Sequence, residues 1–192
     1  MPDVAIDACS RAASLVAPLC LPVEDFARFQ GLDVAQVPEP YRSLLDHHDH
    51  MTVVMERFHR QSLGLRVVAR IDERADPRSR YTREILLVDT LGEPVQHGIV
   101  RIDLAKVGPE TAIRIRAARE PLGRVLIEAG LLRRVERVQL LRVDAGPGLA
   151  ALLGIGHGAE RISYGRVADI ALSGEAVPAV ELLEIVAPPK SV

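Results

Sequence analysis

Apolar side chains recur at helical spacing in the segment MTVVMERF, residues 51–58. Its two methionines and Phe58 fall on one stripe, and the charged residues fall off it. Asp49 or His50 stands where a cap residue is expected, and Gly64 follows as an end signal. The pattern predicts an amphipathic helix that buries one face.

Residues 1–45 are predicted to form a helical N-terminal segment. Apolar positions suit a helix to about Ala17, where Pro18 interrupts it, and shorter helical pieces follow at residues 23–29 and 41–48. The first part of the chain is therefore expected to be built from helices, with strands following later.

Apolar runs bounded by turn residues predict strands in the rest of the chain. These strands cover residues 65–71, 81–89, 95–104, 133–144, 162–172 and 179–187. A charged loop at residues 72–80 separates the first two, and the sequence LGEP suits a hairpin turn between the second and third. Helical spacing returns at 109–118 and at 121–130, where Pro121 suits the first helical position and Gly130 the C-terminal cap. Hairpin strands beside segregated helices indicate an α+β fold with an antiparallel sheet.

Arg83 is the most informative residue of the predicted strands. Side chains alternate across a strand, so Arg83 shares an apolar face with Ile85 and Leu87 while Glu84 points the other way. A guanidinium held against an apolar layer is expected to have a fixed anionic partner, either in the protein or in a ligand. The alternative is that its aliphatic stem packs on the strand while its charged head reaches water.

Length and composition indicate one ordinary globular domain, residues 1–192. Hydrophobic residues make up 48% of the chain and charged residues 26%. The net charge of −2 offers no basic field for a phosphate backbone, and an aromatic content of 3% without tryptophan offers few platforms for stacked bases. Nucleic acid is therefore not expected as a partner.

The two cysteines, Cys9 and Cys20, lie in the apolar N-terminal segment and have no metal-binding or redox spacing, so they are expected to be reduced core thiols. That segment lacks a basic start and is interrupted by charges, unlike a signal peptide. No apolar stretch has the length of a membrane span. These features predict a cytoplasmic protein with no membrane insertion, either a monomer or a small homo-oligomer.

Three apparent motifs are not expected to carry chemistry. The Asp and His cluster at residues 46–50 offers metal-binding donors, but five adjacent side chains at a helix boundary diverge, so a solvated helix end with a capping carboxylate is favoured. The glycine-rich stretch at 146–158 lacks the lysine and spacing of a phosphate loop. No serine lies in a GxSxG nucleophile motif. No metal and no cofactor are predicted.

Two helix starts suit a bound carboxylate. The first N–H groups of a helix have no internal acceptor and carry the positive end of the helix dipole. Leu122 and Gly123 offer such groups after Pro121, and Met51 and Thr52 offer them on the earlier helix. Together with the arginine on its apolar strand face, they predict a buried site for a small carboxylate.

In their order along the chain, four short segments resemble the chorismate pyruvate-lyase family. They are MTVVMERF at Met51, TREILL around Arg83 with GEPVQHG after it, PLGRVL at Pro121, and YGRVADIALSG before the last strand, and the resemblance spans about residues 44–189. It implies a single lyase-like domain, with an N-terminal segment of residues 1–45 and a core of residues 46–189. The implied core is a six-stranded antiparallel sheet with helices at one face and over the ligand pocket.

The same resemblance implies the activity and the site. Enzymes of this family eliminate pyruvate from chorismate and leave 4-hydroxybenzoate, without a cofactor. By the resemblance, Arg83 and the main-chain N–H groups of Met51 and Leu122, next to Gly123, hold the ring carboxylate. A glutamate of the last strand addresses the ring oxygen, and burial among apolar neighbours would favour its neutral form.

One departure from the family pattern concerns a second cation. The glycine after the EP turn precedes an arginine in the family, whereas here Gly98 precedes Ile99. The enolpyruvyl carboxylate of chorismate would then depend on another cation, either Arg166 or Arg101.

A further open choice concerns the catalytic glutamate. Counting from the glycine of the last hairpin selects Glu181, and counting within the last strand selects Glu184. Hairpin turns tolerate insertions, so the count within the strand and Glu184 are preferred. The two residues differ by three positions and should face opposite sides of the sheet.

The competing function is binding without turnover. The same fold also resembles the effector-sensing domains of certain bacterial transcription regulators, which bind a small molecule such as an aromatic acid. Regulators of this kind carry an N-terminal winged helix, and the roughly 45 residues before Met51 are expected to be too few and too acidic to form one.

Overall fold

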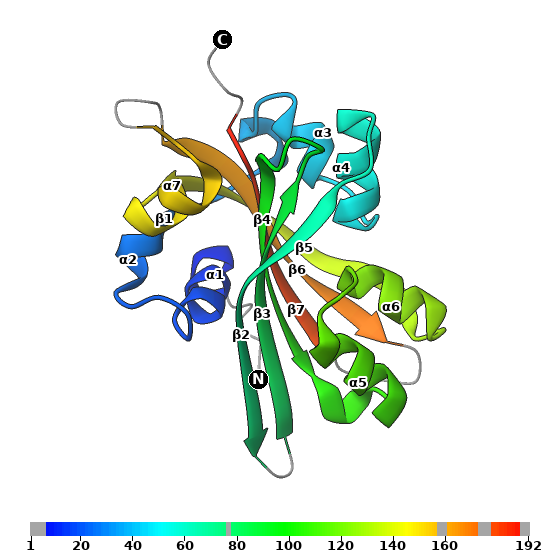
Figure 1. Ribbon diagram of the computed structural model, residues 1–192. Helices are drawn as coiled ribbons and strands as arrows, with labels where there is room; N and C mark the ends of the chain where they lie inside the picture. Colours follow the sequence, from blue (N-terminus) through cyan, green and yellow to red (C-terminus); the bar gives the residue numbers. More distant parts are fainter. Residues whose placement is uncertain (1–6, 76–77, 157–160, 173–177, 189–192) are drawn as a thin grey trace.

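The structure is a computed structural model that describes residues 7–75, 78–156, 161–172 and 178–188 (Figure 1). Its centre is one antiparallel sheet of seven strands in the order β1-β5-β6-β7-β4-β3-β2. The strands are β1 (Ala27–Leu32), β2 (Gly64–Ala75), β3 (Arg78–Val88), β4 (Pro94–Asp103), β5 (Leu132–Ala145), β6 (Ile162–Leu172) and β7 (Val180–Val186). The predicted α+β class with a large antiparallel sheet is confirmed.

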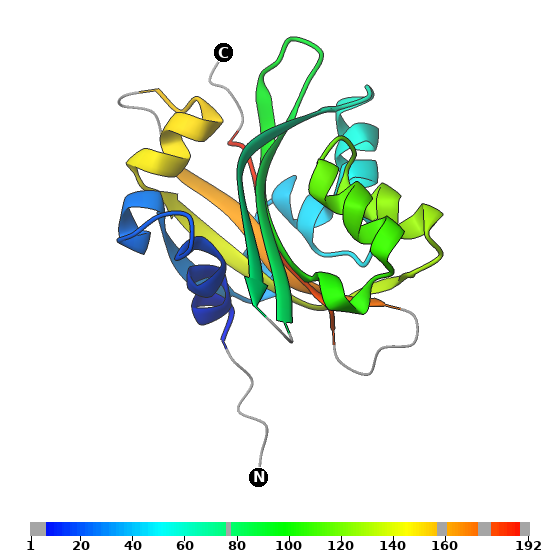
Figure 2. The same ribbon diagram turned by 60° about the horizontal axis from the view of Figure 1, so that its bottom comes forward.

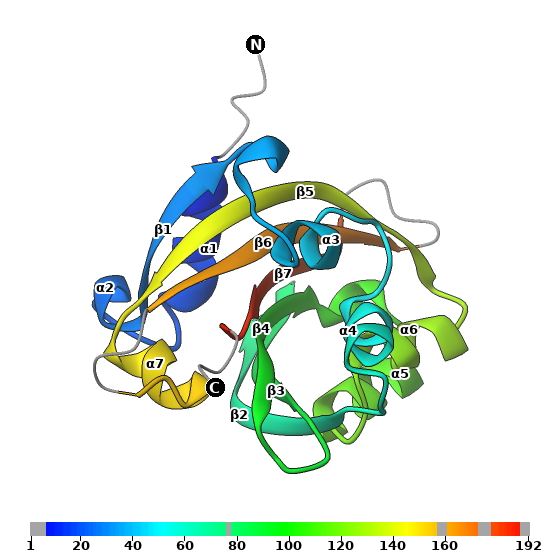
Figure 3. The same ribbon diagram turned by 90° about the horizontal axis from the view of Figure 1, so that it is seen from above.

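Seven α-helices and two short 3-10 helices surround the sheet in the described residues. The α-helices are α1 (Ala8–Val16), α2 (Val23–Phe26), α3 (Tyr41–Leu45), α4 (Met51–His59), α5 (Pro109–Ala117), α6 (Leu122–Glu128) and α7 (Pro147–Leu153). The 3-10 helices are η1 (Val34–Gln36) and η2 (Leu104–Lys106). Figures 2 and 3 show the helices in two groups, with α1, α2 and α7 on one side of the sheet and α3 to α6 on the other.

The strand count of six was wrong, because β1 forms a seventh strand. Residues 27–32 lie in the segment predicted to be helical, yet they pair along β5 from Ala27 opposite Ala145 to Leu32 opposite Leu140. A run of six residues is too short for its periodicity to separate strand from helix. The open backbone edge of β5 decides the outcome, because β1 satisfies its N–H and C=O groups.

The hairpin of β2 and β3 is also longer than predicted. The charged residues 72–80 were expected to form a loop, but β2 continues to Ala75 and β3 begins at Arg78, so the pair projects beyond the rest of the sheet (Figure 1). Glu73 lies directly opposite Arg80 in the register. Opposite charges at facing positions favour strand pairing. From the sequence alone, these charges were taken only as a sign of a polar loop.

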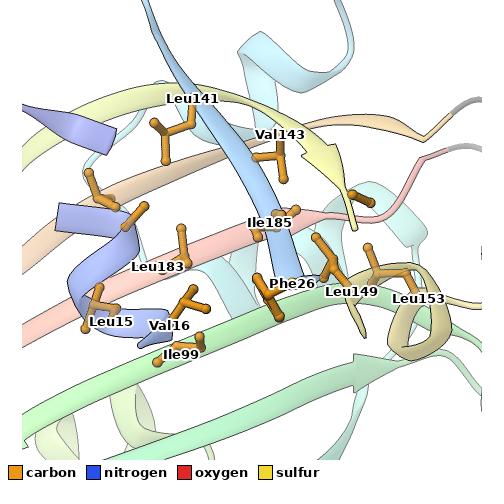
Figure 4. Close-up of a cluster of buried hydrophobic side chains, with 14 of the residues drawn as sticks. Leu15, Val16, Phe26, Ile99, Leu141, Val143, Leu149, Leu153, Leu183 and Ile185 are labelled. Carbon is orange, nitrogen blue, oxygen red and sulfur yellow. The ribbon is translucent and has the colours of Figure 1, made fainter. Parts of the chain in front are cut away.

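One core lies between the sheet and the group of α1, α2 and α7. Figure 4 shows Leu15 and Val16 of α1, Phe26 of α2 and Leu149 and Leu153 of α7 gathered over apolar side chains of the strands. The buried strand residues of this core include Ile99, Leu141, Val143, Leu183 and Ile185. Both cysteines are half-buried and pack against this core, and both are free.

The opposite face carries two further cores. One packs α5 and α6 against the sheet and includes Leu122, Val100 and Leu182. The other packs α3 and α4 and includes Met51 and Leu87. Side chains from both cores line a single cavity, described below.

The predicted helix boundaries hold to within a few residues, with three corrections. His50 is the N-cap of α4 without any side-chain cap bond, so the expected capping carboxylate of the 46–50 cluster is absent. The helix ends at His59, before a left-handed Arg60, and Phe58 of its predicted apolar stripe is 49% exposed. Pro121 is the N-cap of α6 and not its first helical residue. Within the described residues, no helix has the length and apolarity needed to cross a membrane.

Candidate ligand-binding site

A cavity lies over Gly98 on the face of the sheet covered by α3 to α6. Gly98 of β4 faces Glu184 of β7 on one side and Ile85 of β3 on the other. Because the residue at the centre of this row has no side chain, space remains above the strand. The cavity has a volume of about 80 Å³, several times the ~10–15 Å³ that one water molecule needs.

Two neighbouring rows of the sheet bound the cavity along the strands. In one row, Arg83 of β3 faces Val100 of β4, which faces Leu182 of β7. In the other, Leu87 of β3 faces Gln96 of β4. The N-terminal ends of two helices contribute further lining residues, which are His50, Met51, Thr52, Pro121, Leu122 and Gly123.

Arg83 lines the cavity as a buried cation. The residue is 2% exposed, so its head does not reach bulk water, and the alternative that it snorkels to the surface was wrong. Its Nη1 donates to the Glu120 carbonyl at 3.3 Å, while its Nε has no hydrogen-bond partner in the part of the chain that the structure describes. None of the ion pairs among the described residues includes Arg83. The described residues therefore supply no anionic partner for Arg83, and a bound ligand is the other partner expected from the sequence.

Burial lowers the pKa of the Arg83 guanidinium below its ordinary value, and the positive charge of the neighbouring Arg70 acts in the same direction. An arginine nonetheless stays protonated at neutral pH, because its ordinary pKa lies far above 7. Arg83 therefore places a desolvated positive charge beside the cavity.

The two predicted helix starts reach the same cavity. Neither α4 nor α6 has a side-chain cap at its N-terminus. Met51 and Leu122, the first residues of these helices, line the space together with Gly123. Their N–H groups have no acceptor within the helix. The two helix starts therefore add positive electrostatic potential to the cavity that Arg83 lines.

His50 belongs to the lining, although the sequence reading assigned it only to a helix end. A Cβ added at Gly123 would come within 3.2 Å of its Nδ1, so glycine lets the ring lie against the start of α6. Burial lowers the pKa of His50, and the nearby charge of Glu184 acts in the opposite direction. The imidazole is accordingly neutral at neutral pH. His50 directly precedes Met51, which was assigned to the site from the sequence. This adjacency was the signal that could have identified His50 as a lining residue.

Glu184 faces the cavity, in an ion pair with Arg166. The Nε of Arg166 lies 2.7 Å from Oε2 of Glu184. Arg166 is fully buried, and its other nitrogens donate to the carbonyls of Leu45, His47 and Asp49. The carboxylate of Glu184 is therefore held by a fixed cation as well as by its apolar neighbours. Arg166 holds this carboxylate and the 45–49 segment in place, with every nitrogen bonded to the protein.

Glu181 and Arg101 lie on the other face of the sheet, away from the cavity. The two Arg101–Glu181 bonds measure 2.7 and 2.9 Å, and Arg101 also donates to the Ser14 carbonyl. Glu181 and Glu184 therefore have opposite orientations, as their separation of three residues requires. Of the two glutamates and two arginines left open by the sequence, the structure brings Glu184 and Arg166 into the site.

The His and Asp cluster at 46–50 does not converge on a point. His47 lies 3.2 Å from a nitrogen of Arg166, and the Nδ1 of His48 lies 2.9 Å from the Val135 carbonyl. Across the ranges that the structure describes, no group of three or more His, Cys, Asp or Glu side chains is arranged to hold a metal ion.

Gln96 is another polar lining residue that sequence reasoning missed. It is 2% exposed, and its amide oxygen has no hydrogen-bond partner among the residues that the structure describes. On β4 it shares a face with Gly98 and Val100, so the alternation of side chains could have identified it as a polar residue on an apolar face.

No protein-family model and no curated protein matches this sequence. Among solved structures, the fold is similar to a ligand-binding domain from Bordetella bronchiseptica assigned to the GntR family of transcriptional regulators. The TM-score is 0.52 at 18% identity, over 68% of this chain and 92% of that one. It is also similar to PhnF from Mycobacterium smegmatis, with a TM-score of 0.52 at 17% identity, over 72% of this chain and 64% of that one. At these identities the likeness shows a shared fold alone.

Proposed function

We propose that this chain is a binding domain for a small organic acid, which it holds in the cavity over Gly98. The observation that carries this proposal is Arg83, a buried guanidinium that has no anionic partner among the described residues and borders an open space. A buried charge is costly unless it is paired, so the ligand's carboxylate would complete the site.

The rest of the lining supports a flat, mainly apolar ligand. Ile85, Leu87, Val100 and Leu182 provide apolar walls, and the missing side chain of Gly98 leaves a floor on which a ring can lie. The N-termini of α4 and α6, which also line the cavity, add N–H groups that suit an anion. An aromatic monocarboxylate matches this arrangement of one cation without an ion pair among the described residues, apolar walls and a polar group at Glu184.

The structural neighbours favour binding over turnover. The Bordetella bronchiseptica structure is a ligand-binding domain of a transcriptional regulator, and it shares the fold of this chain over 92% of its own length. By analogy with that domain, we propose that the chain senses its acid and does not consume it.

A second candidate function is chorismate pyruvate-lyase, favoured by the position of Glu184. This carboxylate faces the same cavity as Arg83, which is the arrangement implied by the resemblance to that family. In this reaction the enolpyruvyl C–O bond at C3 breaks, the proton at C4 leaves, and the ring becomes aromatic as pyruvate is released. Arg83 would orient the ring carboxylate, and Glu184 would move the proton, without a cofactor.

Calorimetry and product analysis test both candidates on the same protein. Benzoate, 4-hydroxybenzoate and chorismate should each bind and raise the Tm, in buffer that contains EDTA. Release of pyruvate from chorismate would decide for the lyase, and binding without pyruvate would decide for the sensor. Failure of all three acids to bind at millimolar concentration would refute the proposed site.

A further inference from the structure

We infer that Gln96 recognises a second polar substituent on the bound acid, a hydroxyl group next to the one that Glu184 addresses. The inference rests on the proposed function, because it assumes that the carboxylate of the ligand lies at Arg83. It adds a specificity-determining residue and narrows the ligand to acids whose ring carries two adjacent polar groups at the end away from the carboxylate.

The environment of Gln96 gives no structural reason for an amide. In its row of the sheet the neighbours are Leu87 of β3 and Val186 of β7, and both are buried. Its amide oxygen has no partner in the described part of the chain. A buried polar atom without a hydrogen bond destabilises a protein, and leucine or methionine would fill the same volume without this cost.

The amide also leans toward the cavity floor. A Cβ built on Gly98 would come 3.8 Å from the Nε2 of Gln96, so the head of Gln96 reaches from its own row toward the row of Glu184. Gln96 and Glu184 therefore border the space over Gly98 from two adjacent strands. Both are lining residues of the cavity.

The rows of the sheet set the position of the second substituent. Arg83 and Leu87 are four residues apart on β3, which corresponds to roughly 13 Å along the strand. The side chains of Arg83 and Gln96 point into the cavity from the two ends of this span, and the space between them suits one benzoate-sized ring. With the carboxylate at Arg83, the edge of the ring near Glu184 and Gln96 carries its para and meta positions.

A hydroxyl group is the substituent that suits an amide with a free oxygen. The hydroxyl can donate to Oε1 of Gln96 and accept from Nε2, whereas a methoxy group can only accept. An acid with hydroxyls at the meta and para positions would satisfy Gln96 and Glu184 together. An acid with a para hydroxyl alone would leave the Gln96 oxygen unpaired.

Three acids compared on the wild-type protein and on Gln96→Met test this inference. The probes are 4-hydroxybenzoate, 3,4-dihydroxybenzoate and 4-hydroxy-3-methoxybenzoate, titrated by calorimetry in the presence of EDTA. For the wild type, the dihydroxy acid should bind about three- to tenfold more tightly than the monohydroxy acid, the gain expected from one hydrogen bond. The methoxy acid should show no such gain.

In Gln96→Met the preference for the dihydroxy acid over 4-hydroxybenzoate should disappear, because the amide that distinguishes the two acids is gone. The Tm of each variant monitors folding, and Gln96→Leu serves as a second apolar replacement. Equal affinities in the wild type, or a preference that survives both replacements, would overturn the role of Gln96 and leave the carboxylate site standing. If none of the acids binds, the proposed function fails and this inference fails with it.

Discussion

Replacing Arg83 with methionine should stabilise the ligand-free protein and abolish binding of the acid. Arg83 is 2% exposed, has no ion-pair partner among the described residues and leaves its Nε unbonded. Methionine has a similar length, keeps the apolar contacts of the stem and removes the desolvated charge. If Arg83 served to stabilise the fold, its replacement would lower the Tm. The sign of the change in Tm therefore distinguishes a structural role from a binding role.

The magnitudes follow from the burial of the charge. Replacing buried ionic groups with apolar groups of similar volume is neutral or stabilises by about 1–4 kcal/mol. For a chain of this size each kcal/mol shifts the Tm by about 2–4 °C, so the ligand-free variant should melt several degrees above the wild type. Loss of the partner of a buried carboxylate costs about 2–5 kcal/mol of binding, which corresponds to roughly a 30- to 5,000-fold weaker Kd.

Thermal unfolding and calorimetry with 4-hydroxybenzoate measure both quantities on Arg83→Met. The matched control is Arg70→Met, because Arg70 lies directly opposite on β2 and is exposed, so its replacement should leave the Tm and the affinity nearly unchanged. Arg83→Lys should recover little of the binding, since an ammonium cannot reproduce the planar fork. A destabilised Arg83→Met that still binds the acid with wild-type affinity would refute the reasoning.

Three further predictions concern Gly98 at the floor of the cavity, the carboxylate of Glu184, and the dependence of the Tm on pH. Gly98→Ala should fold, because its Cβ would meet Cγ1 of Ile85 at 3.3 Å, a contact that a shift of a few tenths of an ångström relieves, yet it should bind the acid at least about tenfold more weakly in calorimetry because the new methyl group occupies the floor of the cavity. If chorismate is turned over, Glu184→Gln should lower kcat by about 10²–10⁴ in a pyruvate assay, whereas Glu181→Gln on the other face should not; the reverse result would exclude the assigned register. Burial lowers the pKa of His47 and of His50 below 6.5, so the unfolded chain takes up protons first and the Tm should fall as pH drops through about 6.5; a Tm that rises there would contradict these shifts.

Local pattern was enough to predict the elements that carry most of the site. The alternation of side chains along residues 81–89 placed Arg83 on the face that the structure shows to be the cavity wall. Helical spacing and a proline signal located the starts of α4 and α6 to within one residue. The same period of two assigned Glu181 and Glu184 to opposite faces before any fold was known. These features depend on neighbours in the sequence, which is why the sequence reveals them.

Pairing between distant segments could not be predicted in the same way. The strand β1 exists because β5 offers an open edge more than a hundred residues later in the chain. The sequence also left open which cation would serve as a second anion site, and in the structure Arg166 bonds to Glu184 and to three carbonyls of the 45–49 segment. Neither arrangement leaves a signal in a window of ten or fifteen residues. The partner of a buried polar group is a property of the tertiary structure.

The two buried arginines of the cavity differ in how completely the protein satisfies them, and this difference separates support from binding. A guanidinium presents five N–H donors in a fixed plane, and leaving them unmet in the interior destabilises the fold. Each nitrogen of Arg166 has an acceptor among the described residues, so the protein already uses most of the donors of this guanidinium. Arg83 has the Glu120 carbonyl at 3.3 Å as its protein acceptor in the described ranges, and its Nε has none. In the proposed site, an acid that binds at Arg83 would not have to displace an ion pair of the protein, so Arg83 is the arginine of the cavity at which we expect the carboxylate.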